Sequence, residues 1–360
     1  MSTQNLVIRA GARAAKRLRE EGFHPDLFGT LVGASGGPKW LVLRHLDAVL
    51  IDRLIQPRTT TLDLLGSSIG SFRHACYAQA DPQVALTCFE PAYVEQSYAE
   101  DELDRKGLPS KAAITRESIR VLALTLGDAG AKEICEHPLL RTNIVAARLR
   151  NDRGRDRGLR FQLQVGAGAV ANAFSRRALG RHFERVVFQT DGAGLGWDDL
   201  PTSIAPLTPE RVARALLSSG SIPLLMEGVR DVPGVPGTHF DGGIIDYHFD
   251  FGFARDDRLV LFPHFFDQIT PGWFDKPWKK RFPSASALDD VVMIAPSDAF
   301  VATLPGGKVP DRDDFLDFAE SERVARWYDV VERCRGLAEE LTELIEGERF
   351  GDRLEPFAAA

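Results

Sequence analysis

The sequence lacks the features of a membrane-spanning, secreted or nucleic-acid-binding protein. No apolar run approaches the length that a helix needs to cross a bilayer. The first residues, 1–9, contain no basic region followed by an apolar core, so no signal peptide is visible. The net charge is −7 and neither half of the chain is strongly basic, which argues against a nucleic-acid partner. We therefore expect no transmembrane segment and no contact with nucleic acid.

Cysteine and histidine are also scarce. The four cysteines are scattered and form no Cys-x-x-Cys pair, which is typical of free thiols in a reducing compartment. A cytoplasmic location is the expectation that follows. The eight histidines show no His-x-x-x-His spacing, so the sequence predicts no zinc site. We therefore expect no metal site.

The chain does contain enough apolar sequence for a large core. It has 360 residues, of which 44% are hydrophobic and 26% charged, as in ordinary globular enzymes. Apolar runs of strand length alternate with helical patterns, which predicts an α/β fold with a mostly parallel sheet covered by helices. The predicted strands are 28–32, 62–65, 143–146, 161–165, 186–188, 259–262 and 291–294.

Three parts of the chain are predicted. An amphipathic helix at about 5–21 leads the chain within residues 1–26. The main α/β part spans 27–300 and includes a helical, strand-poor insertion at about 81–138. The last part, 301–360, is predicted to be helical.

One motif has the form of a catalytic turn. A short apolar strand ends in Gly66-Ser67-Ser68-Ile69-Gly70, and an apolar helix follows. Glycines on both sides allow the sharp strand-to-helix turn that exposes the middle serine at the edge of a sheet. A serine at a helix N-terminus also lies where negative charge is stabilised. Ser68 is therefore the candidate nucleophile.

Two further motifs flank this turn. Upstream, a predicted strand runs into a loop that contains Gly36 and Gly37, and a helix starts near Pro38. Downstream, the chain reads Asp241-Gly242-Gly243. In this order, the three motifs resemble the patatin-like phospholipases, a family of lipid acyl hydrolases, over about residues 27–245. The resemblance implies a central, mostly parallel sheet sandwiched between helices, with a helical insertion after the nucleophile helix.

The resemblance also implies a mechanism. Ser68 is the nucleophile and Asp241 the base, acting as a dyad without a histidine, and backbone N–H groups of Gly36 and Gly37 form the oxyanion hole. Gly66, Gly70, Gly242 and Gly243 are expected to support the two catalytic turns. The implied activity is cleavage of carboxylic esters of lipids through an acyl-enzyme, without a cofactor, with a lipid or acyl ester as the partner.

The Gly-rich loop departs from the family pattern at two positions. Where the family has Gly-Gly-Gly-x-Arg/Lys-Gly, this chain has Ser35 for the first glycine and Trp40 for the last. Gly36, Gly37 and Lys39 match the pattern. Lys39 is expected to neutralise a nearby acid or phosphate, or to be a surface charge.

Other interpretations of the catalytic residues stay open. His248 or His264 could complete a Ser-His-Asp triad of the α/β-hydrolase type. The segment Ser218–Pro223 contains Ser-Gly-Ser-Ile-Pro, which also looks like the patatin-like family. Asp191-Gly192 is a second Asp-Gly pair, but it precedes this segment, whereas the family's catalytic aspartate follows it. A thioesterase or transacylase would use the same residues. A non-catalytic lipid-binding relative is the alternative of another class.

Two nucleotide-binding patterns are weaker. The loop 33–40 lacks the glycine before the lysine and the Ser/Thr after it that a P-loop needs. The segment 166–171 satisfies Gly-x-Gly-x-x-Ala after a predicted strand, which is a weak dinucleotide signal or a small-residue turn.

Aromatic and basic residues gather in one stretch broken by proline and glycine. Residues 262–282 contain phenylalanines, tryptophans and the run Lys279-Lys280-Arg281. Such a stretch suits either a loop that contacts a lipid surface or a loop folded onto the protein's own core. The first reading would add peripheral membrane contact to the expected cytoplasmic location.

Overall fold

A single ten-stranded sheet runs through the molecule. The computed structural model describes residues 4–105, 107–150, 158–192, 195–253, 256–278 and 280–357. The strand order is β10-β1-β9-β8-β2-β3-β4-β5-β6, and β7 pairs with β4 beside this path. The strands are β1 (Leu6–Ala10), β2 (Phe28–Gly33), β3 (Leu62–Ser67), β4 (Leu140–Leu149), β5 (Phe183–Gln189), β6 (Thr202–Pro206), β7 (His239–Asp241), β8 (Leu259–Pro263), β9 (Val291–Pro296) and β10 (Leu354–Pro356).

The centre of the sheet is parallel. Strands β9, β8, β2, β3 and β4 pair in parallel, while β1 runs antiparallel to β9 and β5 antiparallel to β4. Every residue of β2 and β3 is buried, as expected for strands covered on both faces. The predicted α/β fold with a mostly parallel, covered sheet is confirmed.

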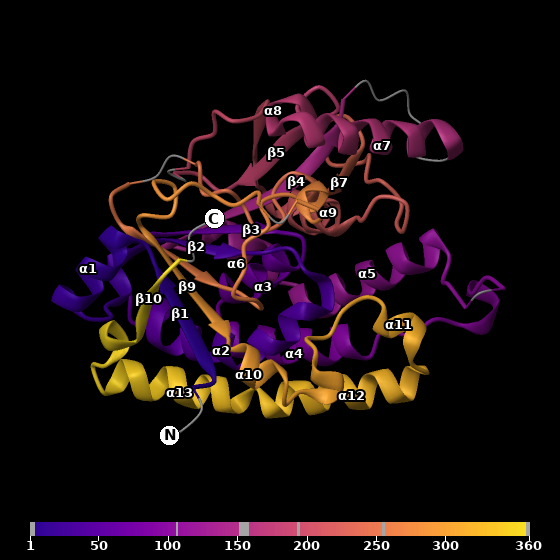
Figure 1. Cartoon of the computed structure of the whole chain (residues 1–360). Helices are drawn as coiled ribbons and strands as arrows, with labels where there is room; N and C mark the ends of the chain where they lie inside the picture. Colours follow the sequence, from indigo (N-terminus) through magenta and orange to yellow (C-terminus); the bar gives the residue numbers. More distant parts are fainter. Residues whose placement is uncertain are drawn as a thin grey trace.

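Helices cover both faces of this sheet. Figure 1 shows α12 and α13 along one side of the molecule, with α7 and α8 on the opposite side. The helices are α1 (Ala12–Glu21), α2 (Arg44–Leu50), α3 (Ile69–Tyr77), α4 (Pro82–Val94), α5 (Lys111–Leu126), α6 (Gly130–Glu136), α7 (Gly158–Phe174), α8 (Arg176–Leu179), α9 (Pro209–Gly220), α10 (Asp298–Val301), α11 (Asp314–Asp317), α12 (Glu320–Arg333) and α13 (Arg335–Glu346). The predicted insertion at 81–138 holds α4, α5 and α6.

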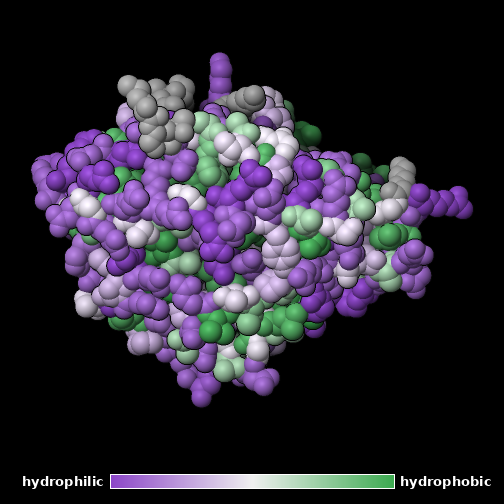
Figure 2. Space-filling view, turned by 90° about the horizontal axis from the view of Figure 1, so that it is seen from below, coloured by the Kyte–Doolittle hydropathy of each residue, from purple (hydrophilic) through white to green (hydrophobic). Residues whose placement is uncertain are grey.

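The two C-terminal helices are amphipathic. Trp327 and Val330 of α12, and Leu337, Leu341 and Leu344 of α13, are buried at spacings of three and four residues. The view from below in Figure 2 shows a mainly hydrophilic surface with separate hydrophobic areas. No described helix combines the length and the apolar content that crossing a membrane requires.

Two secondary-structure predictions are wrong. Residues 161–165 lie inside helix α7, because Phe161, Val165, Gly168 and Asn172 form its buried face at helical spacing. A five-residue run of alternating polarity fits one helical turn as well as a strand, so the pattern alone could not decide. The Gly-x-Gly-x-x-Ala segment at 166–171 is also helical, which removes the nucleotide-binding turn.

The predictions for the two terminal segments are also wrong in part. Leu6–Ala10 form strand β1 rather than the start of a helix, with residues alternately buried and half-buried. The described residues of the segment 301–360 are mainly helical up to α13, and β10 follows, where Leu354 pairs with Ile8 of β1. Both terminal segments therefore extend the central sheet.

Candidate active site

Ser68 occupies a strained turn between β3 and α3. Its backbone has φ 54° and ψ −127°, in a region that residues other than glycine rarely adopt. The turn places Ser68 directly before the first helical residue, Ile69, at the positive end of α3. The predicted strand–serine–helix turn is therefore present.

The glycines of this turn are required by close packing. A Cβ on Gly66 would lie 2.7 Å from the Cα of Ser71, and a Cβ on Gly70 would overlap the carbonyl group of Gly33. The start of α3 thus packs directly on the end of β2. Both positions exclude any side chain, which accounts for the Gly-x-Ser-x-Gly pattern.

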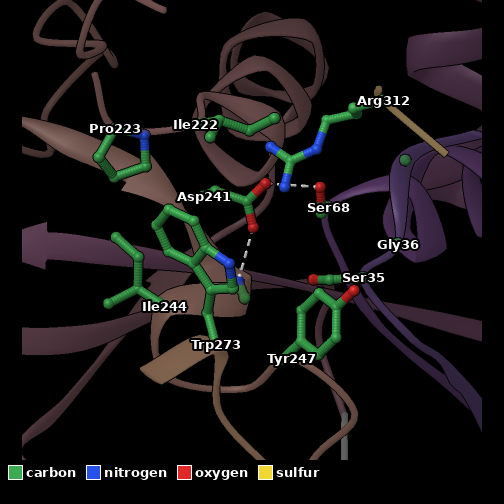
Figure 3. A pocket seen from close by; sticks show the side chains of 12 residues that line it. Ser35, Gly36, Ser68, Ile222, Pro223, Asp241, Ile244, Tyr247, Trp273 and Arg312 are labelled. Atoms are coloured by element: carbon green, nitrogen blue, oxygen red, sulfur yellow. Dashed lines mark hydrogen bonds between the residues drawn. The ribbon is translucent and has the colours of Figure 1, made fainter. Parts of the chain in front are cut away.

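Asp241 lies against the Ser68 hydroxyl. The Ser68 Oγ donates a 2.7 Å hydrogen bond to Oδ2 of Asp241, and the N–H of Gly243 donates one of 2.7 Å to Oδ1 (Figure 3). Asp241 ends β7 and starts the short helix η5 (Gly242–Ile244), and both catalytic candidates are buried. The structure brings the two predicted residues together with no histidine between them.

The carboxylate of Asp241 is made more basic by its surroundings. Burial raises the pKa of Asp241 above its ordinary value, because removing water disfavours the charged form. The hydrogen bonds from Ser68 and Gly243 and the positive charge of Arg312 act in the opposite direction without cancelling this rise. A more basic carboxylate suits the role of general base.

Asp241 is also held by its own turn. A Cβ on Gly242 would overlap the carbonyl oxygen of Val145, and a Cβ on Gly243 would lie 2.7 Å from Oγ of Ser35. Both glycines of the Asp-Gly-Gly motif are therefore confined between the sheet and the Gly-rich loop.

The loop with Gly36 and Gly37 faces the same cavity. Both residues line a cavity of about 30 Å³, which Ser68 and Asp241 also line. Neither N–H group donates a hydrogen bond within the described part of the chain. Gly37, which starts helix η2 (Gly37–Leu43), has φ 57°, a backbone conformation that favours glycine. These two amides are available to an oxyanion.

The residues of the Gly-rich loop, including the two that depart from the family pattern, contact other parts of the protein. The Oγ of Ser35 lies 2.9 Å from Oγ of Ser67, so it joins the loop to the residue before the nucleophile. Trp40 is fully buried and stacks on Phe89 of α4, with ring centroids 4.6 Å apart. Lys39 is half-buried, which lowers its pKa, and its Nζ lies 5.7 Å from the centroid of the Phe266 ring.

Ser219, at the end of α9, supports the turn, although the sequence did not single it out. Its Oγ accepts a 2.8 Å hydrogen bond from the N–H of Ser68 and donates one of 2.6 Å to the carbonyl of Val145. Since its proton goes to Val145, the 3.1 Å contact with Ser71 has Ser71 as donor. Ser219 lies in the Ser218–Pro223 segment, and its place in that segment is the sequence feature that could have indicated its role.

Arg312 is the second residue that the sequence did not indicate. It precedes α11, lines the cavity, and in Figure 3 directs its guanidinium toward Ser68 and Asp241. Within the described residues this guanidinium has no ion-pair partner. No motif surrounds Arg312, so only the fold reveals its place.

The alternative catalytic residues lie elsewhere. His248 and His264 are buried with their rings packed together, and each Nδ1 contacts a backbone group rather than Ser68 or Asp241. Asp191 is exposed and lines a different cavity, with Cys135 and Arg141. In the described part of the chain, no group of three or more histidine, cysteine or acidic residues is placed to hold a metal.

The aromatic stretch 262–282 is largely internal. Phe262 and Phe265 are buried in the core, so these rings are not placed to contact a lipid surface. Trp278 is 48% exposed, and Lys279 lies outside the described residues. For most of its aromatic residues, the reading of a loop folded onto the core is confirmed.

Comparison with known protein families and with curated proteins finds no match to this chain.

Proposed function

We propose that this chain is a serine acyl hydrolase of the patatin-like type that cleaves carboxylic esters of lipids. The observation that carries the proposal is the 2.7 Å hydrogen bond from Ser68 to Asp241 at a strained strand-to-helix turn. Acyl transfer needs a nucleophile, a base and donors for the oxyanion, and the third element is supplied by the amides of Gly36 and Gly37.

The proposed reaction has two halves. Asp241 Oδ2 takes the Ser68 proton as Oγ attacks the ester carbonyl carbon, and the oxyanion binds the amides of Gly36 and Gly37. The carbon–oxygen bond of the leaving alcohol breaks, the alcohol takes the proton from Asp241, and an acyl-Ser68 ester remains. Water then gives a proton to Asp241 and attacks the carbonyl carbon of this ester. The bond between the acyl carbon and Oγ breaks, Ser68 takes the proton back from Asp241, and the acid is released.

The walls of the cavity favour an acyl substrate. Ile222, Pro223, Ile244 and Trp273 supply apolar surface beside the nucleophile. This cavity has a volume of about 30 Å³.

A fluorophosphonate probe tests the proposal directly. The wild-type protein should be labelled at Ser68 and should hydrolyse p-nitrophenyl esters of fatty acids. Ser68→Ala should abolish both, while Ser67→Ala, which removes the neighbouring buried hydroxyl, should still be labelled. A cleanly folded wild-type protein that neither reacts nor hydrolyses would contradict the proposal and favour the non-catalytic lipid-binding alternative.

A further inference from the structure

Helix α7 carries an unusual exposed apolar face. The four most exposed large apolar side chains of the described chain are all on this helix. They are Leu159 (70%), Leu163 (63%), Val170 (60%) and Phe174 (85%). We refer to these four residues as the α7 stripe.

The stripe occupies one side of the helix. Spacings of four, seven and four residues, at about 100° per residue, place the four side chains within a sector of about 60°. From Leu159 to Phe174 the stripe is about 22 Å long, at a rise of about 1.5 Å per residue. Exposed apolar side chains gathered along one side of a helix over this length mark a site of interaction.

The opposite face of α7 already anchors the helix to the protein. Phe161 and Val165 are buried, and the Phe161 ring stacks on Phe240 with centroids 5.1 Å apart. Asn172 Nδ2 donates a 2.6 Å hydrogen bond to Asp275, in helix η6 (Trp273–Asp275). The stripe is therefore not needed to hold α7 in place.

The charged residues within the segment 158–183 are all of one sign. The segment 158–183 contains four arginines and no acidic residue, in a chain whose net charge is −7. Arg160, Arg177 and Arg181 are exposed, while Arg176 is paired with Asp199 and with the buried Asp246. A helix with an apolar face and flanking arginines fits the boundary between the acyl chains and the head groups of an anionic membrane.

We propose that α7 is a membrane-docking helix that lies flat on an anionic lipid surface through the α7 stripe. The apolar side chains enter the acyl boundary, and Arg160 and Arg177 contact the acidic head groups. The helix is also close to the candidate active site. Phe240, on which Phe161 of α7 stacks, precedes Asp241, and Trp273 of η6 lines the cavity. The inference depends on exposure and charge, and not on the chemistry of Ser68.

Vesicle flotation with the Ser68→Ala protein tests docking without turnover. We expect it to float with phosphatidylcholine vesicles that contain phosphatidylglycerol and to bind pure phosphatidylcholine far more weakly. In that background, Leu163→Gln with Phe174→Gln should weaken binding at least tenfold, because two apolar side chains no longer enter the acyl boundary. Arg160→Gln and Arg177→Gln should each weaken binding to the anionic vesicles about fivefold.

The matched control removes apolar side chains of similar exposure elsewhere. Val84→Gln with Leu124→Gln, at positions 56% and 52% exposed on α4 and α5, should leave vesicle binding unchanged. Equal loss in both double variants, or no anionic-vesicle binding by the Ser68→Ala protein, would overturn the proposal. So would a lipid-free dimer that Leu163→Gln with Phe174→Gln converts to a monomer, since the stripe would then be covered by a second copy.

Membrane docking through α7 and hydrolysis at Ser68 can be tested separately, so either can fail without the other. Loss of vesicle binding with intact Ser68 labelling and hydrolysis of dissolved esters would remove only the membrane contact. Vesicle binding without Ser68 reactivity would remove only the hydrolase.

Discussion

The hydroxyl of Ser68 and the carboxylate of Asp241 are 2.7 Å apart although 173 positions separate them in the sequence. The contact forms because β3 and β7 both neighbour β4, where Ser67 pairs with Val145 and Asp241 with Ala146. Strand β4 thus holds the ends of two distant segments at one place. The pair is set by the sheet rather than by the loops.

Removing either member of the pair should eliminate ester hydrolysis. Ser68→Ala and Asp241→Asn should each lower turnover by about a thousandfold or more, because nucleophile and base act as a unit. Initial rates with a p-nitrophenyl ester measure this, with circular dichroism to verify folding. Asp191→Asn, at the other Asp-Gly, should stay active, and the reverse pattern would show that Asp241 is not the base.

Gly37→Val should lower turnover by about a hundred- to a thousandfold. A side chain strains the backbone at φ 57° and turns the amide away from the oxyanion. Gly22→Val is the matched control, since Gly22 also has positive φ and a side chain there would meet no atom within 4 Å of its Cβ. If the two variants lost equal activity, the loss in Gly37→Val would be due to backbone strain in general and not to the oxyanion hole.

Ser219→Ala should lower kcat with little change in KM. The substitution leaves the buried N–H of Ser68 without its acceptor, which costs about 1–3 kcal/mol and loosens the strained turn. Ser221→Ala is the control, because that buried hydroxyl bonds the carbonyl of Leu217 and not the turn. A Ser219→Ala protein with full kcat would exclude a positioning role.

The pH profile of turnover should report the ionisation of Asp241. The base must be charged, so activity falls as pH drops through its pKa, which burial places above that of an ordinary aspartate. Arg312 favours the charged form; Arg312→Gln should therefore raise this pKa and move the acid limb to higher pH. Arg333→Gln, on the exposed end of α12, should leave the limb in place. If Arg312→Gln left the acidic side of the pH profile unchanged, Arg312 would have no influence on the ionisation of Asp241.

The buried histidines should be dispensable for chemistry. His248→Gln and His264→Gln should keep Ser68 labelling and turnover within a few-fold, because each Nδ1 contacts only backbone groups. Labelling by the fluorophosphonate probe is the measurement. Loss in a folded variant would restore the Ser-His-Asp alternative.

The sequence alone was sufficient for features that depend on neighbouring residues. The turn at Gly66–Gly70 is readable because its two glycines and the apolar strand before it are local requirements. The central strands are readable because a strand buried on both faces needs an uninterrupted apolar run. Ser68 followed from this local turn, whereas its pairing with Asp241 followed from motif order and a family resemblance.

Tertiary structure decided what depends on packing between distant segments. Residues 161–165 alternate in polarity, and only the contacts of Phe161 and Val165 with the core made them helical. Leu6–Ala10 became a strand because β9 and β10 offer backbone partners on both sides. Ser219 reached the backbone of Ser68 from α9, and Arg312 reached the candidate cavity from the segment before α11, with no motif to mark Arg312. Hydrogen bonds and charges between remote segments exist only once the chain has folded, so no local pattern encodes them.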